Sequence, residues 1–225
     1  MFESLKHAKV GSELIPELLR SLPEDFRLDD HQVHQFGVYL DLILQWNSKA
    51  GLMSSADEDR LIKRHIVESL GVLSLKLLWP SAEVLDLGTG GGFPGIPVKI
   101  AMPSLMMTLL DSRRMKGLFL EEVVRTLALV HTQVVNDRAE RVKERLASRY
   151  DFVLARAVSD LKTLWSWSSP LLKRGGSLLA QKGGDLETEL NQLLHSYSKL
   201  HPQQIQYPKN WDIEPSRCII VLEKE

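Results

Sequence analysis

Glu83-Val-Leu-Asp-Leu-Gly-Thr-Gly-Gly-Gly-Phe-Pro-Gly95 is the stretch that decides the fold of this chain. Its first five residues form a short apolar run typical of a buried strand, and five of the next eight are glycines. In doubly wound sheets, ligands bind beyond the carboxyl ends of the strands, where glycines let the backbone approach them closely. The stretch therefore predicts a strand, a ligand loop and a helix that begins near Pro94 or Pro97.

Short apolar runs alternate with helical patterns in the rest of the chain, which predicts an α/β fold. The expected strands are Val84–Leu87, Met106–Leu110, Gln133–Val135, Phe152–Ala155, Ser177–Ala180 and Cys218–Leu222. The expected helices lie near 95–101, 115–128, 139–148, 160–172 and 185–198. Such alternation produces a mostly parallel sheet that helices cover on both faces. No helical pattern separates 199–207 from 217–223, so we expect the last strands to pair antiparallel.

The first 80 residues have a different pattern, because their apolar residues repeat at helical spacing. Three helices are expected, over Leu14–Leu22, from Asp29-Asp30 to about Trp46, and from Asp57 to about Leu78. The period changes near Ala82. We therefore expect an N-terminal helical cap over residues 1–80 and a Rossmann-like domain over residues 81–225.

The composition is that of a globular chain, with 44% hydrophobic and 25% charged residues and a net charge of −1 over 225 residues. A nearly neutral chain needs a local basic patch to bind nucleic acid. The single cysteine, Cys218, excludes an internal disulfide and fits a reducing compartment. The N-terminus lacks the apolar region of a signal peptide, and no apolar run could cross a bilayer. We expect a cytoplasmic protein with no membrane partner.

The glycine loop also matches the dinucleotide pattern G-x-G-x-x-G between Gly90 and Gly95, with Asp111 about twenty residues further on. A dinucleotide places its pyrophosphate at the helix N-terminus, and a nearby carboxylate opposes this. Asp86 stands two residues before Gly88, the first glycine. A carboxylate there suits a cationic ligand such as S-adenosylmethionine, which has ammonium and sulfonium groups. The pattern favours this methyl donor over an NAD(P)-binding oxidoreductase or a turn without a ligand.

Two later strand ends carry carboxylates suited to a nucleoside. Asp111 can accept both ribose hydroxyl hydrogens, or it can cap the helix expected after Ser112. After the third strand, Asp137 and Glu140 both fit a position that reads the adenine edge, and spacing does not separate them.

The sequence lacks the motifs of two classes of base methyltransferase. The fourth strand is followed by Ala155-Arg-Ala-Val-Ser159, without the Asn/Asp-Pro-Pro-aromatic motif of enzymes that methylate exocyclic amines. A pyrimidine C5 methyltransferase needs a thiolate nucleophile. Cys218 lies in an apolar strand, where a buried structural thiol is expected. Both classes are therefore disfavoured.

Further motifs follow in order along the chain. They are Asp86–Pro97, Leu110–Ser112, Phe119–Glu121, Arg138–Glu140, Arg156-Ala157 and Lys182-Gly183, with Trp46-Asn47 and His65–Leu70 in the helical lead-in. With these motifs the chain resembles the RsmG family, also called glucose-inhibited division protein B, whose members methylate guanine N7 of bacterial 16S rRNA. The segment Gly51-Leu-Met-Ser54 departs from the family's Asn-Leu-Thr, so contacts of that Asn or Thr are not carried over.

The resemblance implies a Rossmann-like class I methyltransferase fold with S-adenosylmethionine as its cofactor. It implies that the donor site is lined by Gly88, Phe93, Ala139, Glu140 and Arg156, which selects Glu140 for the adenine edge. It also places Arg156 near the cofactor or the target base, whereas a salt bridge to Asp86 or a neighbouring carboxylate is a simpler role. Guanine N7 carries a free lone pair, so catalysis by positioning is expected, with no general base and no metal.

An RNA substrate requires basic side chains. We expect Arg113, Arg114 and Lys116 to contact phosphates, and Lys182 to face the pocket and touch the target nucleotide. Two further clusters, which are solvated helix faces in the simpler interpretation, are Arg60, Lys63 and Arg64, and Arg138, Arg141, Lys143, Arg145 and Arg149. The small basic excess favours a shaped partner such as the small ribosomal subunit, bound by a monomer. The alternative is a non-catalytic RNA-binding assembly factor with the same fold.

Overall fold

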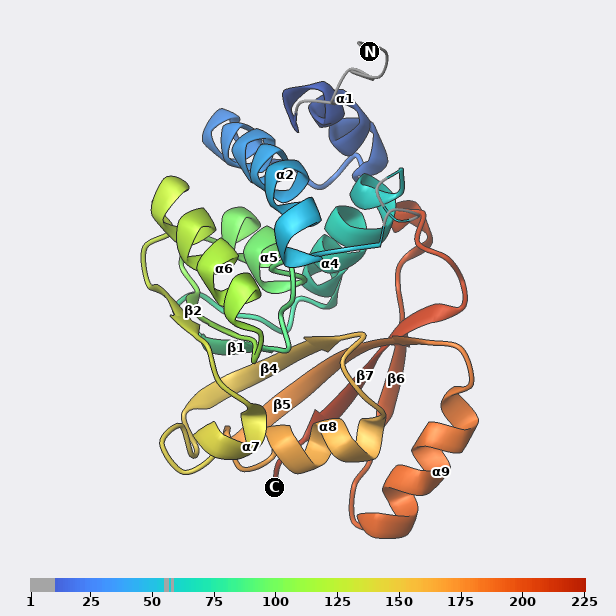
Figure 1. Ribbon diagram of the computed structural model, residues 1–225. Helices are drawn as coiled ribbons and strands as arrows, with labels where there is room; N and C mark the ends of the chain where they lie inside the picture. The colour runs from blue at the N-terminus through green and yellow to red at the C-terminus, as the bar shows by residue number, and fades with distance from the viewer. Residues whose placement is uncertain (1–10, 55–56, 58) are drawn as a thin grey trace, which may run out of the picture.

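A computed structural model describes residues 11–54, 57 and 59–225; residues 1–10, where no signal peptide is expected, lie outside the described part. The centre is a seven-stranded sheet in the order β3-β2-β1-β4-β5-β7-β6 (Figure 1). The strands are β1 Glu83–Leu87, β2 Met106–Leu110, β3 Thr132–Val135, β4 Tyr150–Arg156, β5 Leu172–Gly183, β6 Gln203–Gln206 and β7 Arg217–Glu223. β1 to β5 are parallel, and β7 is antiparallel to both β5 and β6. The predicted α/β class and the antiparallel last pair are confirmed.

The strand register brings several loops to one edge of the sheet. Leu87 of β1 pairs with Leu110 of β2 and Ala155 of β4, so these carboxyl ends lie side by side. Arg217 begins the antiparallel β7 and pairs with Gly183 at the end of β5. The start of β7 therefore lies at the same edge as the glycine loop.

Helices cover both faces of the sheet, as predicted (Figure 1). α5 (Gly95–Ala101) and α6 (Arg114–Thr126) lie on one face, and α7 (Ala139–Val142), α8 (Leu161–Ser168) and α9 (Leu186–Ser196) lie on the other. Alternate strand residues supply two cores: Val84 belongs to the core on the α5 face, and Leu85 to the core on the α8 face. None of the described helices is long and apolar enough to span a membrane.

Two predicted helices are shorter than their sequence patterns suggest. The helix expected over 139–148 ends at Val142, and the helix expected over 160–172 ends at Ser168. The residues after the end of each helix form turns instead. The Ser148 N–H donates to Pro170 O, and the Leu171 N–H donates to Ser168 O. Leu172 pairs with Tyr150 as the first residue of β5. Pairing with the sheet thus overrides the helical periodicity.

The N-terminal region contains α1 (Gly11–Ser21) and α2 (Asp30–Ala50), close to their predicted positions. The third predicted helix, over 57–78, is wrong as one continuous helix. It is a π-helix η1 (Leu61–Val67), one turn of α-helix α4 (Glu68–Leu70) and a 3₁₀-helix η2 (Gly71–Leu75). The left-handed Lys76 follows η2, so the segment ends before Leu78.

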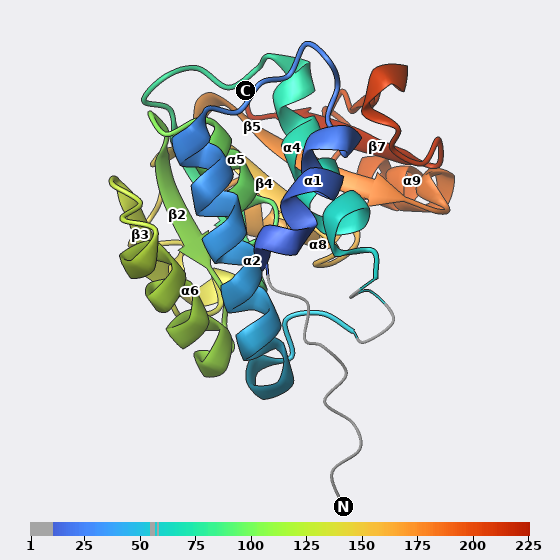
Figure 2. The ribbon, with the colours of Figure 1, turned by 90° about the horizontal axis from the view of Figure 1, so that it is seen from above.

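Side chains on one face of α2 donate hydrogen bonds to backbone carbonyls at three places in the sheet domain. Gln32 Nε2 donates to Ile100 O at the end of α5, Gln35 Nε2 donates to Leu127 O after α6, and the Tyr39 hydroxyl donates to Gly91 O in the glycine loop. Figure 2 shows α2 lying across α5 and α6 as an outer layer. The core on this face includes side chains from α2, α5 and α6 together. The division at residue 80 into a cap and a domain stays a prediction.

The start of α2 offers a test of the predicted helix signal. Asp29 forms a capping box with Gln32: its Oδ1 accepts from the Gln32 N–H at 2.7 Å, and its own N–H donates to Gln32 Oε1 at 2.9 Å. We expect Asp29→Ala to lower the free energy of unfolding by about 1 kcal/mol in urea denaturation. Glu24→Ala, an exposed control that precedes the box, should change it by less than about 0.5 kcal/mol. Equal losses in both variants would contradict the assignment.

Candidate functional site

A cavity of about 530 Å³ opens beside the carboxyl ends of β1 and β2, in the size range of small-molecule sites. Four of the predicted donor-site residues line this cavity: Gly88, Asp111, Ala139 and Glu140. Its wall also includes the apolar Val158 and Trp167 and the polar Ser112, Arg113, Asp137 and Arg138. We call this space the β1 cavity.

Asp111 is the carboxylate that fixes the rim of the β1 cavity. Its Oδ2 accepts from the Gly90 N–H at 2.9 Å, and its Oδ1 accepts from the Arg113 N–H at 2.8 Å. The side chain thus ties the glycine loop to the end of β2, while 9% of the residue stays exposed. α6 begins at Arg114, so Asp111 closes a turn before the helix rather than acting as its N-cap.

Asp86 lies beneath the glycine loop and is fully buried. Its Oδ2 accepts from the Thr89 hydroxyl at 2.5 Å and from the Gly95 N–H at 2.6 Å, so it holds both ends of the loop. The side chain shares the α5 face with Val84, whereas the β1 cavity lies on the side of α7 and α8. Burial raises the pKa of Asp86 to about 7. The predicted contact with a cationic ligand group stays untested.

Phe93 and Arg156 meet behind the loop, outside the lining of the β1 cavity. The Arg156 guanidinium lies 5.0 Å from the centre of the Phe93 ring, and the His65 ring stacks against the same ring at 4.9 Å. Arg156 Nη1 donates to Arg64 O, and Nη2 contacts His65 Nδ1, both at 2.7 Å. Arg156 forms no ion pair with Asp86 or another carboxylate among the described residues, so the simpler role predicted for it is not seen.

The Arg156–His65 contact sets the state of the imidazole. A guanidinium has only donors, so His65 Nδ1 must accept and the proton of the neutral ring lies on Nε2. Burial, followed by the charge of Arg156, lowers the pKa of His65 to about 4. His65 Nε2 and Asp86 Oδ1 are buried atoms with no hydrogen-bond partner in the described part of the chain.

The segment that departs from the family pattern also lies behind the loop. Asn47 Oδ1 accepts from the N–H groups of Leu52 and Met53, each at 3.0 Å. Gly51 has a φ of 57°, which glycine adopts without strain, and it ends α2. Leu52 is buried against Gly91. The Trp46-Asn47 motif therefore shapes the segment that supports the loop.

Tyr39 is a residue that the sequence analysis missed. Its hydroxyl donates to Gly91 O at 2.6 Å, and its ring centre lies 5.9 Å from that of Phe93. Burial raises the pKa of this phenol well above its ordinary value. An aromatic residue in an apolar helix pattern gives no signal that its polar end reaches a loop 52 residues away in sequence.

The predicted RNA-contacting residues lie in different surroundings. Arg113 lines the β1 cavity, while Arg114 and Lys116 lie in the first turn of α6. Lys182 instead points to α9, where its ammonium pairs with Glu189 at 2.6 Å and donates to Ser159 O at 2.8 Å. Two of the three ammonium donors of Lys182 are therefore already used within the chain. The predicted contacts with RNA stay untested.

The fold and its ligand edge match a known class of enzyme. A solved S-adenosylmethionine-dependent methyltransferase from Aquifex aeolicus superposes with a TM-score of 0.54, covering 75% of this chain and 94% of that one at 18% identity. The sheet order, with its antiparallel β7, and the glycine loop after β1 are those of a class I methyltransferase. The chain therefore has the fold of the class I methyltransferases.

Sequence comparison identifies the family. The model of the rRNA small subunit methyltransferase G family (GidB) matches residues 32–215. Ribosomal RNA small subunit methyltransferase G of Alkaliphilus metalliredigens is 38% identical over 73% of this chain and 70% of its own length. The protein of the same name from Desulforamulus reducens is 34% identical over 89% and 85%. The chain belongs to this family, which confirms the resemblance in the motifs.

The buried Asp86 predicts a specific pH dependence of stability. The native state keeps its proton up to about pH 7, whereas an unperturbed aspartate releases it near 3.8, so the native state binds more protons between these values. Asp86 therefore makes the unfolding free energy fall as pH rises from about 4 to 7. Asp86→Asn removes this contribution. The difference in unfolding free energy, variant minus unmodified chain, should therefore increase by a few kcal/mol between about pH 4 and 7. This follows from about 1.4 kcal/mol for each unit by which the pKa is raised.

Urea denaturation at several pH values measures this difference. His65 has the opposite slope, since its lowered pKa makes stability rise between about pH 4 and 6.5. Both proteins contain His65, so its contribution largely cancels. A difference that does not change with pH would show that Asp86 is already ionised at low pH.

Proposed function

We propose that this chain transfers the methyl group of S-adenosylmethionine to guanine N7 in 16S rRNA, with the donor bound in the β1 cavity. The observation that carries the proposal is that Gly88, Asp111 and Glu140 line one cavity at the end of β1. The names of the family and its members support small-subunit rRNA as the substrate. The choice of guanine N7 rests on the resemblance in the motifs.

The residues of the β1 cavity fit the parts of this donor. Both Asp111 oxygens accept backbone N–H groups, yet a carboxylate has about four acceptor positions, which leaves capacity for the ribose hydroxyls. Ala139 and the exposed Glu140 begin α7 at the cavity wall and would bind the adenine edge. Gly88 has a φ of 70°, and a Cβ there would lie 2.8 Å from the Val158 side chain. Any other residue would therefore strain the backbone and displace Val158 from the cavity wall.

The chain's contribution to the reaction is positioning. When bound, S-adenosylmethionine supplies an electrophilic methyl group on a sulfonium. Guanine N7 has a free lone pair, so no residue needs to remove a proton before the transfer. Asp86 and Asp111 hold the glycine loop from two sides and keep the cavity preformed. Aligning two reactants in this way can lower a barrier by several kcal/mol.

The RNA would reach this edge from solvent. Arg113 beside the β1 cavity, with Arg114 and Lys116 at the start of α6, would bind phosphates near the donor. The cavity is built from one chain, so we propose that a monomer acts on the small subunit. Because ribosomal subunits assemble in the cytoplasm, we propose that the enzyme works there.

The test is methyl transfer to small ribosomal subunits that lack the modification. With methyl-labelled donor, we expect label in 16S rRNA as 7-methylguanine at one position. Subunit binding without label would instead support a non-catalytic assembly factor. Calorimetry that shows affinity for a nicotinamide dinucleotide and none for S-adenosylhomocysteine would support an oxidoreductase.

The adenine-edge assignment can be tested by a matched pair of variants. Glu140 and Asp137 both line the β1 cavity, but Asp137 Oδ1 already accepts the Arg138 N–H at 2.8 Å. We expect Glu140→Ala to weaken the binding of S-adenosylhomocysteine about tenfold in calorimetry, the loss of one good hydrogen bond to a charged group. Asp137→Ala should weaken it less than about threefold. The reverse order would assign the adenine edge to Asp137.

A further inference from the structure

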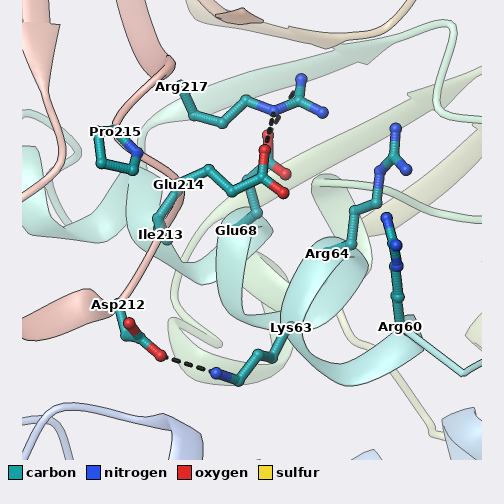
Figure 3. Close-up of a pocket in the computed structure, with 9 residues that line it drawn as sticks. All are labelled: Arg60, Lys63, Arg64, Glu68, Asp212, Ile213, Glu214, Pro215 and Arg217. Carbon is teal, nitrogen blue, oxygen red and sulfur yellow. Dashed lines mark hydrogen bonds and ion pairs between the residues drawn. The ribbon is translucent and has the colours of Figure 1, made fainter.

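A second cavity, of about 490 Å³, lies at the same edge of the sheet as the β1 cavity. It is bounded by η1 and α4 on one side and by residues 212–217 on the other (Figure 3). Arg217 in its wall pairs with Gly183 at the carboxyl end of β5. Arg64 in the opposite wall accepts, through its carbonyl, the hydrogen bond from Arg156 at the end of β4. We call this space the η1 cavity.

Arg156 links the two regions. Its positive charge interacts with Asp86 beneath the glycine loop and with Glu68 in the wall of the η1 cavity. These two carboxylates contribute most to favouring the charged form of Arg156. The η1 cavity therefore lies just beyond the Phe93–His65–Arg156 cluster that backs the donor loop. Arg156 thus connects the loop beside the donor cavity to the wall of the η1 cavity.

Glu68 is the unusual group in this cavity. The residue is 4% exposed, yet no described residue donates a hydrogen bond to its carboxylate. Among the described residues its only ion pair is to Arg217, which is long at 3.9 Å, and Figure 3 shows the two side chains facing each other. Buried carboxylates are normally paired and hydrogen-bonded. Glu68 thus has acceptor capacity that the chain leaves unused.

The backbone around Glu68 is held firmly. Its carbonyl accepts from Gln181 Nε2 at 2.6 Å, and Gln181 also donates to the Tyr207 hydroxyl at 2.8 Å. Glu68 directly follows the seven-residue π-helix η1, a rare conformation that is frequent at functional sites. The segment therefore presents a fixed carboxylate rather than a mobile surface side chain.

A fixed carboxylate selects guanine among the RNA bases. Guanine alone presents two donors side by side on its Watson–Crick edge, N1–H and N2–H₂, and these match the two oxygens of a carboxylate. Adenine presents an acceptor at N1, which a carboxylate repels. A guanine held by this edge points N7 the opposite way, so the carboxylate does not cover the methylation site.

The cations of the η1 cavity suit the rest of a nucleotide. Arg60 has no ion pair among the described residues, and it extends beside Arg64 in Figure 3. Guanidinium groups stack on unstacked bases and bind phosphate oxygens. Lys63 is already paired with Asp212 at 2.7 Å, which leaves Arg60 as the most available cation.

We propose that Glu68 accepts N1–H and N2–H₂ of the target guanine in the η1 cavity and so selects guanine and orients N7. This inference rests on the proposed function, because it assigns the acceptor side of the same reaction. Arg60 binds the phosphate or stacks on the base, whereas Arg64 is already paired with Asp57 at 2.9 Å. Glu68 acts by holding the substrate and takes no part in bond making.

The test compares the binding of guanosine, inosine and adenosine 5′-monophosphates to the full chain in the presence of S-adenosylhomocysteine. Inosine lacks the N2 amino group, and adenosine presents the opposite pattern at N1. By saturation-transfer NMR titration we expect guanosine monophosphate to bind most tightly and inosine monophosphate next. The preference over adenosine monophosphate should be about tenfold or more. Glu68→Gln should reduce this preference below about threefold.

Two further variants separate recognition from structure. Glu68→Asp keeps a carboxylate and should retain the order of the three nucleotides. Glu214→Gln alters a carboxylate of the same cavity that is 72% exposed in its side chain, and it should leave the preference unchanged. Thermal unfolding of each variant verifies that it is folded. A structural role alone would change stability without changing the preference.

Equal binding of the three nucleotides to the unmodified chain would overturn the proposal. So would an unchanged preference in Glu68→Gln, or no binding of guanosine monophosphate at about 10 mM. Methylation of small subunits at guanine N7, combined with any of these results, would leave the proposed function standing without this inference. A Glu68-dependent guanine preference in a chain that transfers no methyl group would refute the proposed function and keep the guanine site.

Discussion

The ligand edge of this enzyme depends on the buried carboxylate of Asp86. Its contacts to Thr89 and Gly95 close the glycine loop into one rigid unit, and Asp111 binds the loop at Gly90 from the neighbouring strand. The rise in the Asp86 pKa to about 7 reflects the cost of burying this group. That cost is offset by two short hydrogen bonds, which a glycine-rich loop needs because its own conformational entropy opposes order.

Much of the fold could be predicted from the sequence because buried parallel strands are near-continuous apolar runs. β1, β2 and β7 begin or end within a residue or two of the apolar runs that predicted them. The strand period also indicates which side of the sheet Asp86 faces. Leu85 and Leu87 face the core on the α8 side, so the intervening Asp86 had to face the α5 side, away from the β1 cavity.

Other parts of the site could not be predicted, since they arise from contacts between distant segments. His65 and Arg156 are 91 residues apart, and nothing in either local pattern indicates their hydrogen bond. The seven residues of η1 make fewer than two helical turns, too few for apolar spacing to distinguish a π-helix from an α-helix, so η1 gave no signal of its own. The basic residue Lys182 looked available in sequence, but Glu189 on α9 binds it in the folded chain.

The placement of charge around Arg156 suits the proposed chemistry. Methyl transfer to guanine N7 moves a positive charge from the donor to the base. The η1 cavity contains the buried carboxylate of Glu68 as well as its cations, so a base held there would gain its charge beside an acidic group. Arg156 favours the ionised form of Glu68 and lies between that residue and the donor loop. Burial raises the pKa of Glu68, and the charge of Arg156 opposes this rise. The same guanidinium packs on Phe93, which links the wall of the η1 cavity to the geometry of the donor loop.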